Sequence, residues 1–479
     1  MRKSTVLIMF AALVLVGWSY LEQYPRKSTE NKELPNIVFF ISDDLSASDI
    51  SLYNSKGVNV KNIVKLAAEG ITFNRAFVAS PSCAPSRGAL LTGLYPARNG
   101  AMANHTYPRE EILKLPNLLR EIGYEVISFG KVGHGFEEQK AKDYGFDHFS
   151  KESVNLPKQV RNFFKNRRNT KPICLLMGDR RPHVPWIKDS NYPMDSVSLP
   201  TFLLNSQETD EHWARYATDI QGMDKDLGEI LTLTKDMFGD DYIFLFSSDH
   251  GSQWPFGKWN LYDYGSHVPL VVSWPNKIKR PRQTNAMVSW VDIFPTLIDL
   301  TGGKLPDNLD GKSFLKVLQN PEANHRDFIY TTHSGDGHFN VYPMRSVRTD
   351  RFKYIHNLFS EYYHTNHSDI LRKNGAGAYW DSWEQLAVND SAAKAIIDKY
   401  HMRPEFEFFD LINDPLEQHN LAGNPKYGKD QEELKKLLAK MNVQQNDSLL
   451  LIGIPYPRTE DLPTQEAIQN RLEARKKDQ

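Results

Sequence analysis

Cysteine is scarce in this chain, and positive and negative charges balance. Only Cys83 and Cys174 occur in 479 residues, which excludes a framework of several disulfides. The formal net charge is −1, which excludes the broad basic field of a nucleic-acid-binding protein, so we expect no such partner. Aromatic residues make up 11% of the chain, enough for a well-packed core, and the length suits one large domain with a smaller one.

The longest apolar run, residues 6–16, follows the basic residues Arg2 and Lys3. It is shorter than the roughly 20 apolar residues of a membrane-spanning helix, so no stable membrane insertion is expected. A basic start before a short apolar run is typical of a secretory signal peptide, which we assign to residues 1–20. Gly17-Trp18-Ser19 is a poor cleavage site, and an uncleaved anchor is the alternative. The sequence therefore predicts an exported protein, periplasmic or secreted.

Two short apolar runs end in residues that can bind a metal. Residues 35–42 and 242–248 have the composition of strands buried on both faces, as in a parallel sheet. Asp43-Asp44 follows the first run and Asp249-His250 the second. Open α/β sheets bind ligands at the carboxyl ends of their strands, so we expect these four residues to meet. A divalent cation would relieve the repulsion between adjacent carboxylates, and a helix cap is the alternative role for Asp43-Asp44.

Cationic and titratable residues follow two further predicted strands. Lys131 and His134 lie in a glycine-rich segment after residues 124–129, and His183 follows residues 171–177 between two prolines. Lysine offers a point charge and histidine a proton carrier near neutral pH. A solvated loop is the alternative for each. The helical periodicity of residues 213–234 predicts that Asp219, Asp224 and Asp226 form a solvated face and caps.

Cys83 stands at the predicted start of a helix that ends at Gly93. Pro85 suits a first helical turn, and glycine suits a C-terminal cap. The free backbone N–H groups at this end favour an anion, and Arg87 lies one turn further on. An ordinary capped helix with a buried thiol is the alternative, and Cys174 is expected to be a small core residue.

The string Cys83-Ala84-Pro85-Ser86-Arg87 with Leu91-Thr92-Gly93 resembles the maturation signature of type I sulfatases and matches every fixed position. In these formylglycine-dependent enzymes of the alkaline-phosphatase-like superfamily, a maturation enzyme oxidises the cysteine to formylglycine (3-oxoalanine), whose hydrated aldehyde is the nucleophile. The resemblance extends over nearly the whole chain after residue 35, with its elements in the family's order.

This resemblance implies a site. The implied catalytic residues are Cys83, Arg87, Lys131, His134, His183 and Lys258. The implied ligands of one Ca²⁺ per chain are Asp43, Asp44, Cys83, Asp249 and His250. Arg87, Lys131 and Lys258 would bind the sulfate ester. His183 would protonate the leaving oxygen, and His134 would act as the base. The two histidine roles remain interchangeable at this point.

The resemblance also implies the architecture. Residues 35–340 would form an α/β catalytic domain, a large and mostly parallel sheet between helices. Residues 341–479 would form a small C-terminal α+β subdomain with an antiparallel sheet. Its expected elements are a hairpin that turns at Thr349-Asp350, an edge strand at residues 406–411 and a helix at residues 432–441.

The segment from Asp249 to Tyr262 resembles heparan N-sulfatase and bacterial sulfatases of polysaccharides. The expected reaction is hydrolysis of sulfate esters on a sulfated carbohydrate, an algal polymer such as ulvan or a glycosaminoglycan such as heparan, and sulfamidase activity is an alternative. The second expected partner is the maturation enzyme acting on Cys83. Phosphoester hydrolysis and silent glycan binding are the competing functions. Candidate subsite residues are Trp254, Trp259, His333, Asp336 and His338, with core packing or plain loop as their alternatives.

Overall fold

The structure, a computed structural model, describes residues 34–278, 281–337, 339–448, 451, 453 and 455–462. The predicted signal peptide at residues 1–20 and the candidate His338 lie outside the described residues. Contacts place the chain from Pro35 onward in one compact unit. Within the described residues, no helix is both long enough and apolar enough to span a bilayer.

A sheet of eight strands, in the order β5-β4-β6-β1-β7-β8-β2-β9, positions most of the predicted site residues. Its centre is parallel: β1 (Asn36–Ser42) lies between β6 (Ile173–Gly178) and β7 (Tyr242–Ser248), and β4 (Glu125–Gly130) pairs with β6. These strands are buried on both faces, which explains their unbroken apolar sequence. The remaining strands of this sheet are β2 (Gly70–Phe73), β5 (His148–Ser150), β8 (Leu270–Ser273) and β9 (Arg282–Thr284).

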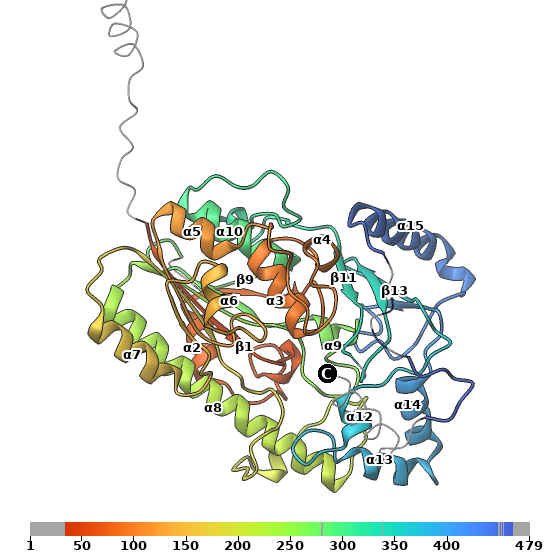
Figure 1. Cartoon of the computed structure of the whole chain (residues 1–479). Coiled ribbons are helices and arrows are strands. Elements are labelled where there is room, and N and C mark those ends of the chain that lie inside the picture. The colour runs from red at the N-terminus through yellow and green to blue at the C-terminus, as the bar shows by residue number, and fades with distance from the viewer. Residues whose placement is uncertain are drawn as a thin grey trace, which may run out of the picture. The chain divides into compact units, whose positions relative to one another are not determined.

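Helices cover both faces of this sheet (Figure 1). One layer consists of α2 (Lys61–Ala68), α7 (Leu156–Asn166) and α8 (Gln207–Phe238). The other consists of α3 (Cys83–Thr92), α5 (Leu115–Ile122) and α10 (Ile293–Thr301). The predicted large, mostly parallel α/β sheet between helices is therefore confirmed. Shorter elements of this part are β3 (Ala76–Phe77), α4 (Pro96–Asn99), α6 (Glu138–Asp143), α9 (Asp263–Ser266), β10 (Val288–Ser289) and α11 (Leu315–Gln319).

The prediction of a solvated acidic face on α8 is wrong for two of its three residues. Asp224 is buried and accepts hydrogen bonds from the backbone N–H groups of Asn62 and Ile63, the latter at 2.8 Å, at the start of α2. Asp219 is also buried and accepts the backbone N–H of Ile187 at 3.0 Å. Both carboxylates satisfy backbone donors of neighbouring segments, which helical periodicity alone does not reveal.

The second sheet has four antiparallel strands, in the order β11-β12-β13-β14. It comprises β11 (Ile329–His333), β12 (Met344–Arg348), β13 (Phe352–Asn357) and β14 (Phe406–Asp410), and α15 (Gly428–Gln444) packs against β12 and β13 (Figure 1). The predicted hairpin and edge strand are confirmed. The sheet begins with β11, before residue 341, and the division into two domains stays a prediction. The other helices here are α12 (His367–Leu371), α13 (Trp380–Ala387) and α14 (Ser391–His401).

Candidate functional site

The acidic pairs meet because β1 and β7 run parallel in register. Ser42 lies opposite Ser248, so Asp43 and Asp249 leave the sheet at the same level. Neighbouring side chains on a strand point to opposite faces, but Asp44 has a φ of 68°, a left-handed conformation that aspartate tolerates. The backbone N–H of Asp44 then donates to Oδ1 of Asp249 at 3.1 Å. This turn brings three carboxylates to one point beyond the strand ends.

Five potential ligand atoms, one each from Asp43, Asp44, Cys83, Asp249 and His250, all lie within 4.8 Å of one another, and all five residues are buried. Nδ1 of His250 lies 2.9 Å from the carbonyl oxygen of Gly251, and Nε2 lies 3.4 Å from Oδ1 of Asp44. An Nδ1–H donating to that carbonyl leaves the Nε2 lone pair for the cluster. Three carboxylates and an imidazole nitrogen therefore fit a divalent cation, and the oxygen-rich set suits Ca²⁺.

Arg87 bridges two of these carboxylates from within α3. Its Nε lies 2.9 Å from Oδ2 of Asp249 and its Nη2 lies 3.2 Å from Oδ1 of Asp43, with all three side chains buried. Burial raises the pKa of Asp249 to about 7, whereas the guanidinium of Arg87 lowers it. Arg87 therefore offsets only part of the cost of burying this carboxylate. Arg87 thus holds the acidic cluster together, and its expected contact with a sulfate group stays a prediction.

Two lysines carry the remaining positive charge of the site. Nζ of Lys131 lies 2.6 Å from Oδ2 of Asp43 and 3.4 Å from Sγ of Cys83. Nζ of Lys258 lies 3.0 Å from Oδ2 of Asp44 and 4.9 Å from the ring centre of Trp259. Both ammonium groups therefore adjoin the carboxylates, where they can also meet an anionic ligand.

Cys83 is the first residue of α3, as predicted, and its Sγ lies 3.2 Å from Nε2 of His250. Burial opposes ionisation of this thiol, but Lys131 and Lys258 outweigh burial and hold its pKa well below the usual value. Cys174 lies in β6, where burial raises the pKa of its thiol. The two cysteines thus differ in chemistry: one is electrostatically activated, and the other is the inert core residue that we expected.

A cavity of about 410 Å³ opens beside Cys83 and brings His134, His183 and Lys258 of the predicted set together with it. His183 Nε2 lies 4.0 Å from Oδ2 of Asp44, and burial lowers the pKa of His183. Several other lining residues were not predicted, because they come from loops and from α12, which lie far apart in the chain. They are Asn104, His105, Val184, Pro185, Gln253, His367, Leu371, Lys373, Asn374 and Ala376.

The two candidate tryptophans divide between core and cavity. Trp254 stacks between Trp186, at 4.7 Å between ring centres, and Tyr379, at 4.8 Å, so its role is packing. Trp259 lines the cavity and stacks on His367 at 4.9 Å. Asp336 also lines the cavity, whereas His333 is buried and hydrogen-bonds Asn340. Trp259 and Asp336 are therefore the candidates that remain in reach of a ligand.

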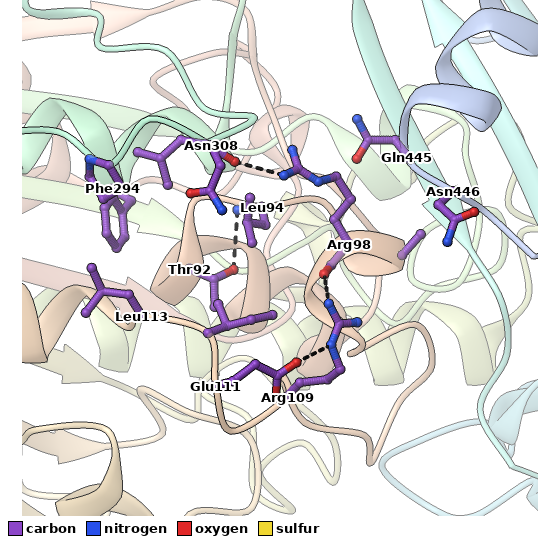
Figure 2. A pocket seen from close by; sticks show the side chains of 14 residues that line it. Thr92, Leu94, Arg98, Arg109, Glu111, Leu113, Phe294, Asn308, Gln445 and Asn446 are labelled. Atoms are coloured by element: carbon purple, nitrogen blue, oxygen red, sulfur yellow. Dashed lines mark hydrogen bonds and ion pairs between the residues drawn. The ribbon is translucent and has the colours of Figure 1, made fainter.

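A larger cavity, of about 600 Å³, lies at the far end of α3 and has a different chemistry (Figure 2). Its charged side chains have partners close by: Arg109 Nε lies 2.8 Å from Oε1 of Glu111, and Arg98 donates to the carbonyl oxygen of Asn308 at 3.0 Å. Its described lining contains no cysteine or histidine. We therefore assign the functional site to the smaller cavity beside Cys83.

Known proteins resemble this chain over most of its length. The model of the Sulfatase family matches residues 35–303, and that of the C-terminal part of N-sulphoglucosamine sulphohydrolase matches residues 250–371. An ulvan-active sulfatase of Formosa agariphila is 32% identical over 451 residues, covering 90% of this chain and 84% of the relative. N-sulphoglucosamine sulphohydrolase of Homo sapiens is 26% identical, covering 86% and 90%.

Among solved structures, that of BT4656 in complex with its substrate D-Glucosamine-2-N, 6-O-disulfate has a TM-score of 0.67 at 20% identity. The match covers 86% of this chain and 98% of that protein. That of Ps i-CgsB in complex with k-i-k-neocarrahexaose has a TM-score of 0.63 at 20% identity, over 92% and 97%. Both comparisons show a shared fold.

Proposed function

Because the chain belongs to the sulfatase family, it is a sulfuric ester hydrolase, and we propose that it removes sulfate from a sulfated polysaccharide or its oligosaccharides. The position of Cys83 carries this proposal. Its Sγ belongs to the five-atom cluster and also lines the 410 Å³ cavity, so a sulfate group there would meet both a cation and the nucleophile position.

The proposed cofactors are one Ca²⁺, held by Asp43, Asp44, Asp249 and His250 beside position 83, and a formylglycine formed from Cys83. When bound, they would supply a positive charge next to the sulfate and a hydroxyl nucleophile. The complete maturation signature and the oxygen-rich cluster support both. A maturation enzyme is then an obligatory partner of the chain.

The protein's own side chains would bind the ester and move protons. Lys131 adjoins both the cluster and the thiol, and Lys258 adjoins the cluster, so both can offset the charge of the sulfate group. His183 lines the cavity and would donate a proton to the leaving sugar oxygen. Burial lowers the pKa of His183, but a sulfate bound beside it would favour the protonated form. His134 would act as the base.

The proposed substrate class follows from the relatives. One of them is an ulvan-active sulfatase and another a sulphohydrolase of N-sulphoglucosamine, so both act on sulfated sugars by their names. In this chain Trp259 presents an aromatic ring and Asp336 a carboxylate to the same cavity, and both groups suit a carbohydrate. We further propose export to the periplasm or the medium, where such polymers are met, with residues 1–20 as the signal peptide.

Release of free sulfate tests the proposal. The protein, co-produced with a maturation enzyme, is incubated with ulvan and heparan oligosaccharides and with an aryl phosphate, and free sulfate and phosphate are measured by ion chromatography. We expect sulfate release that Cys83→Ala abolishes and that the matched variant Cys174→Ala retains. The mass of the peptide containing position 83 should show the conversion of the thiol. Release of phosphate alone, or full sulfate release by Cys83→Ala, would refute the proposal.

A further inference from the structure

His105 was not among the predicted site residues, yet both of its ring nitrogens face another titratable group. Its Nδ1 lies 2.9 Å from Nε2 of His134, and its Nε2 lies 3.4 Å from Oδ1 of Asp336. The two imidazole rings stand edge to face, with 4.7 Å between their centres. Three groups from separate loops thus form a continuous Asp336–His105–His134 chain along one wall of the cavity that contains Cys83.

The carboxylate at the end of this chain is buried and firmly held. The side chain of Asp336 is 3% exposed, and its Oδ2 accepts a hydrogen bond from Nδ2 of Asn104 at 3.0 Å. Oδ1 of Asn104 in turn accepts the backbone N–H of Ala84 at 3.1 Å, in the first turn of α3. Burial opposes ionisation of Asp336, but the hydrogen bond from His105 and neighbouring donors outweigh it and keep the pKa of this carboxyl below its usual value.

The backbone at His105 has a φ of 62°, in the left-handed region that most side chains avoid and that histidine, asparagine and aspartate tolerate. The His105 side chain is 67% exposed, so its contacts with His134 and Asp336 are what orient the imidazole. The other ring nitrogen of His134, Nδ1, is buried and has no hydrogen-bond partner among the described residues. That nitrogen makes no competing hydrogen bond within the described part of the chain, so it can carry either a lone pair or a proton.

We propose that His105 and Asp336 are positioning residues that set the tautomer of His134 and take up its proton, an inference that rests on the function proposed above. With His105 neutral, its Nε2–H points to Asp336 and its Nδ1 accepts the Nε2–H of His134. His134 then presents an Nδ1 lone pair and acts as a base. When Nδ1 takes a proton from a hydroxyl group in the cavity, the Nε2 proton passes to His105. The resulting imidazolium lies beside the Asp336 carboxylate, and the reverse transfer restores the starting state.

The other charges around the pair do not replace Asp336. The hydrogen bond to Asp336 is the largest influence on His105 and raises its pKa, whereas burial and Lys258 lower this pKa and Cys83 raises it. His367 also faces Asp336 across the cavity, and burial lowers the pKa of His367 to about 4, so it is neutral near pH 7. Asp336 is therefore the group that stabilises a proton on His105.

Two conservative variants test this relay. Asp336→Asn keeps the shape of the side chain and removes its charge, and His105→Asn keeps a residue that tolerates the left-handed backbone. We expect each variant to lower kcat roughly 10- to 100-fold with little change in KM, which is the usual cost of losing an outer partner of a reactive histidine. The matched control is Glu125→Gln, which weakens the contact of Glu125 in β4 with His148 in β5, 3.0 Å apart, and an ion pair with Arg167. This variant should leave kcat unchanged.

The pH dependence separates a relay from a substrate contact. Protonated His105 cannot accept a proton, so its raised pKa should set the acidic limb of the kcat profile in the wild type. Asp336→Asn should move that limb to lower pH, because the carboxylate no longer favours the imidazolium. A rise in KM for oligosaccharides at unchanged kcat would instead assign His105 and Asp336 to sugar binding and overturn the relay.

A readout independent of activity uses NMR of the full chain labelled at histidine, with His105→Asn to assign the His105 signal. We expect the pKa of His105 to fall in Asp336→Asn and to stay unchanged in Glu125→Gln. An unchanged pKa in Asp336→Asn would refute the relay even in an active enzyme. Conversely, absence of sulfate release by the wild type would refute the proposed function, whereas the NMR result would still decide whether Asp336 controls His105.

Discussion

Replacing Arg87 by methionine tests whether the acidic cluster depends on one guanidinium. In the structure Arg87 contacts Asp249 at 2.9 Å and Asp43 at 3.2 Å, and the three side chains are at most 1% exposed. Removing one partner of a buried ion pair costs about 3–5 kcal/mol, because the other charge remains desolvated. Asp43 keeps its contact with Lys131 at 2.6 Å, so only the carboxylate of Asp249 loses its partner. We therefore expect the free energy of unfolding of Arg87→Met to fall by about 3–5 kcal/mol.

The assay is urea unfolding followed by tryptophan fluorescence in the presence of EDTA, which keeps bound Ca²⁺ from compensating the missing charge. Arg351→Met serves as the matched control, because Arg351 pairs with Asp410 at 2.8 Å but its side chain is 49% exposed. Such a surface pair contributes about 0–1 kcal/mol. If Arg87→Met loses no more stability than this control, the carboxylates do not depend on Arg87 and our reading of the cluster is wrong.

Three further predictions concern burial, helix capping and metal. Burial raises the pKa of the Asp49 carboxyl to about 7, above the value of roughly 3.9 in an unfolded chain. Ionisation of this buried carboxyl therefore lowers the free energy of unfolding as the pH rises from 4 to 7, and the loss remains at higher pH. Asp49→Asn should therefore be more stable than wild type by up to roughly 4 kcal/mol at pH 8 and not at pH 4. If urea unfolding gives the same stability difference between variant and wild type at both pH values, this prediction is wrong. Asp224→Ala should cost about 1–2 kcal/mol by the same assay, since it uncaps α2, and no loss would show that the cap is dispensable. Asp44→Asn should weaken Ca²⁺ binding at least tenfold by calorimetry, while Asp226→Asn should not.

Much of the site was predictable because its chemistry follows local patterns. The strings around Cys83, Asp43-Asp44 and Asp249-His250 each combine a regular element with reactive side chains at its end, and parallel strands bring such ends together. The strand-end pattern therefore indicated that the two acidic pairs meet, and the resemblance to sulfatases added Cys83 to them. The same reasoning predicted the parallel sheet, since strands buried on both faces need unbroken apolar runs.

What could not be predicted depends on contacts between distant segments. His105 lies in an irregular loop, and only the fold places it between His134 and Asp336. Asp224 matched the pattern of an exposed helix face, but α2 begins directly against it, so the carboxylate caps that helix instead. Helical periodicity indicates which face of a helix is polar. It does not indicate whether those polar side chains accept hydrogen bonds from the backbone of a neighbouring segment.

Asp336 comes three residues after the end of β11, the first strand of the small sheet, yet through Asn104 it is tied to the opening turn of the helix that begins with Cys83. The segment that follows the first strand of the small sheet therefore supplies one member of the proposed relay. A chimera that exchanges this segment with a relative would import a new partner for His105 along with any new specificity. Grafting experiments meant to change substrate preference should therefore retain Asn104 and Asp336 as a unit.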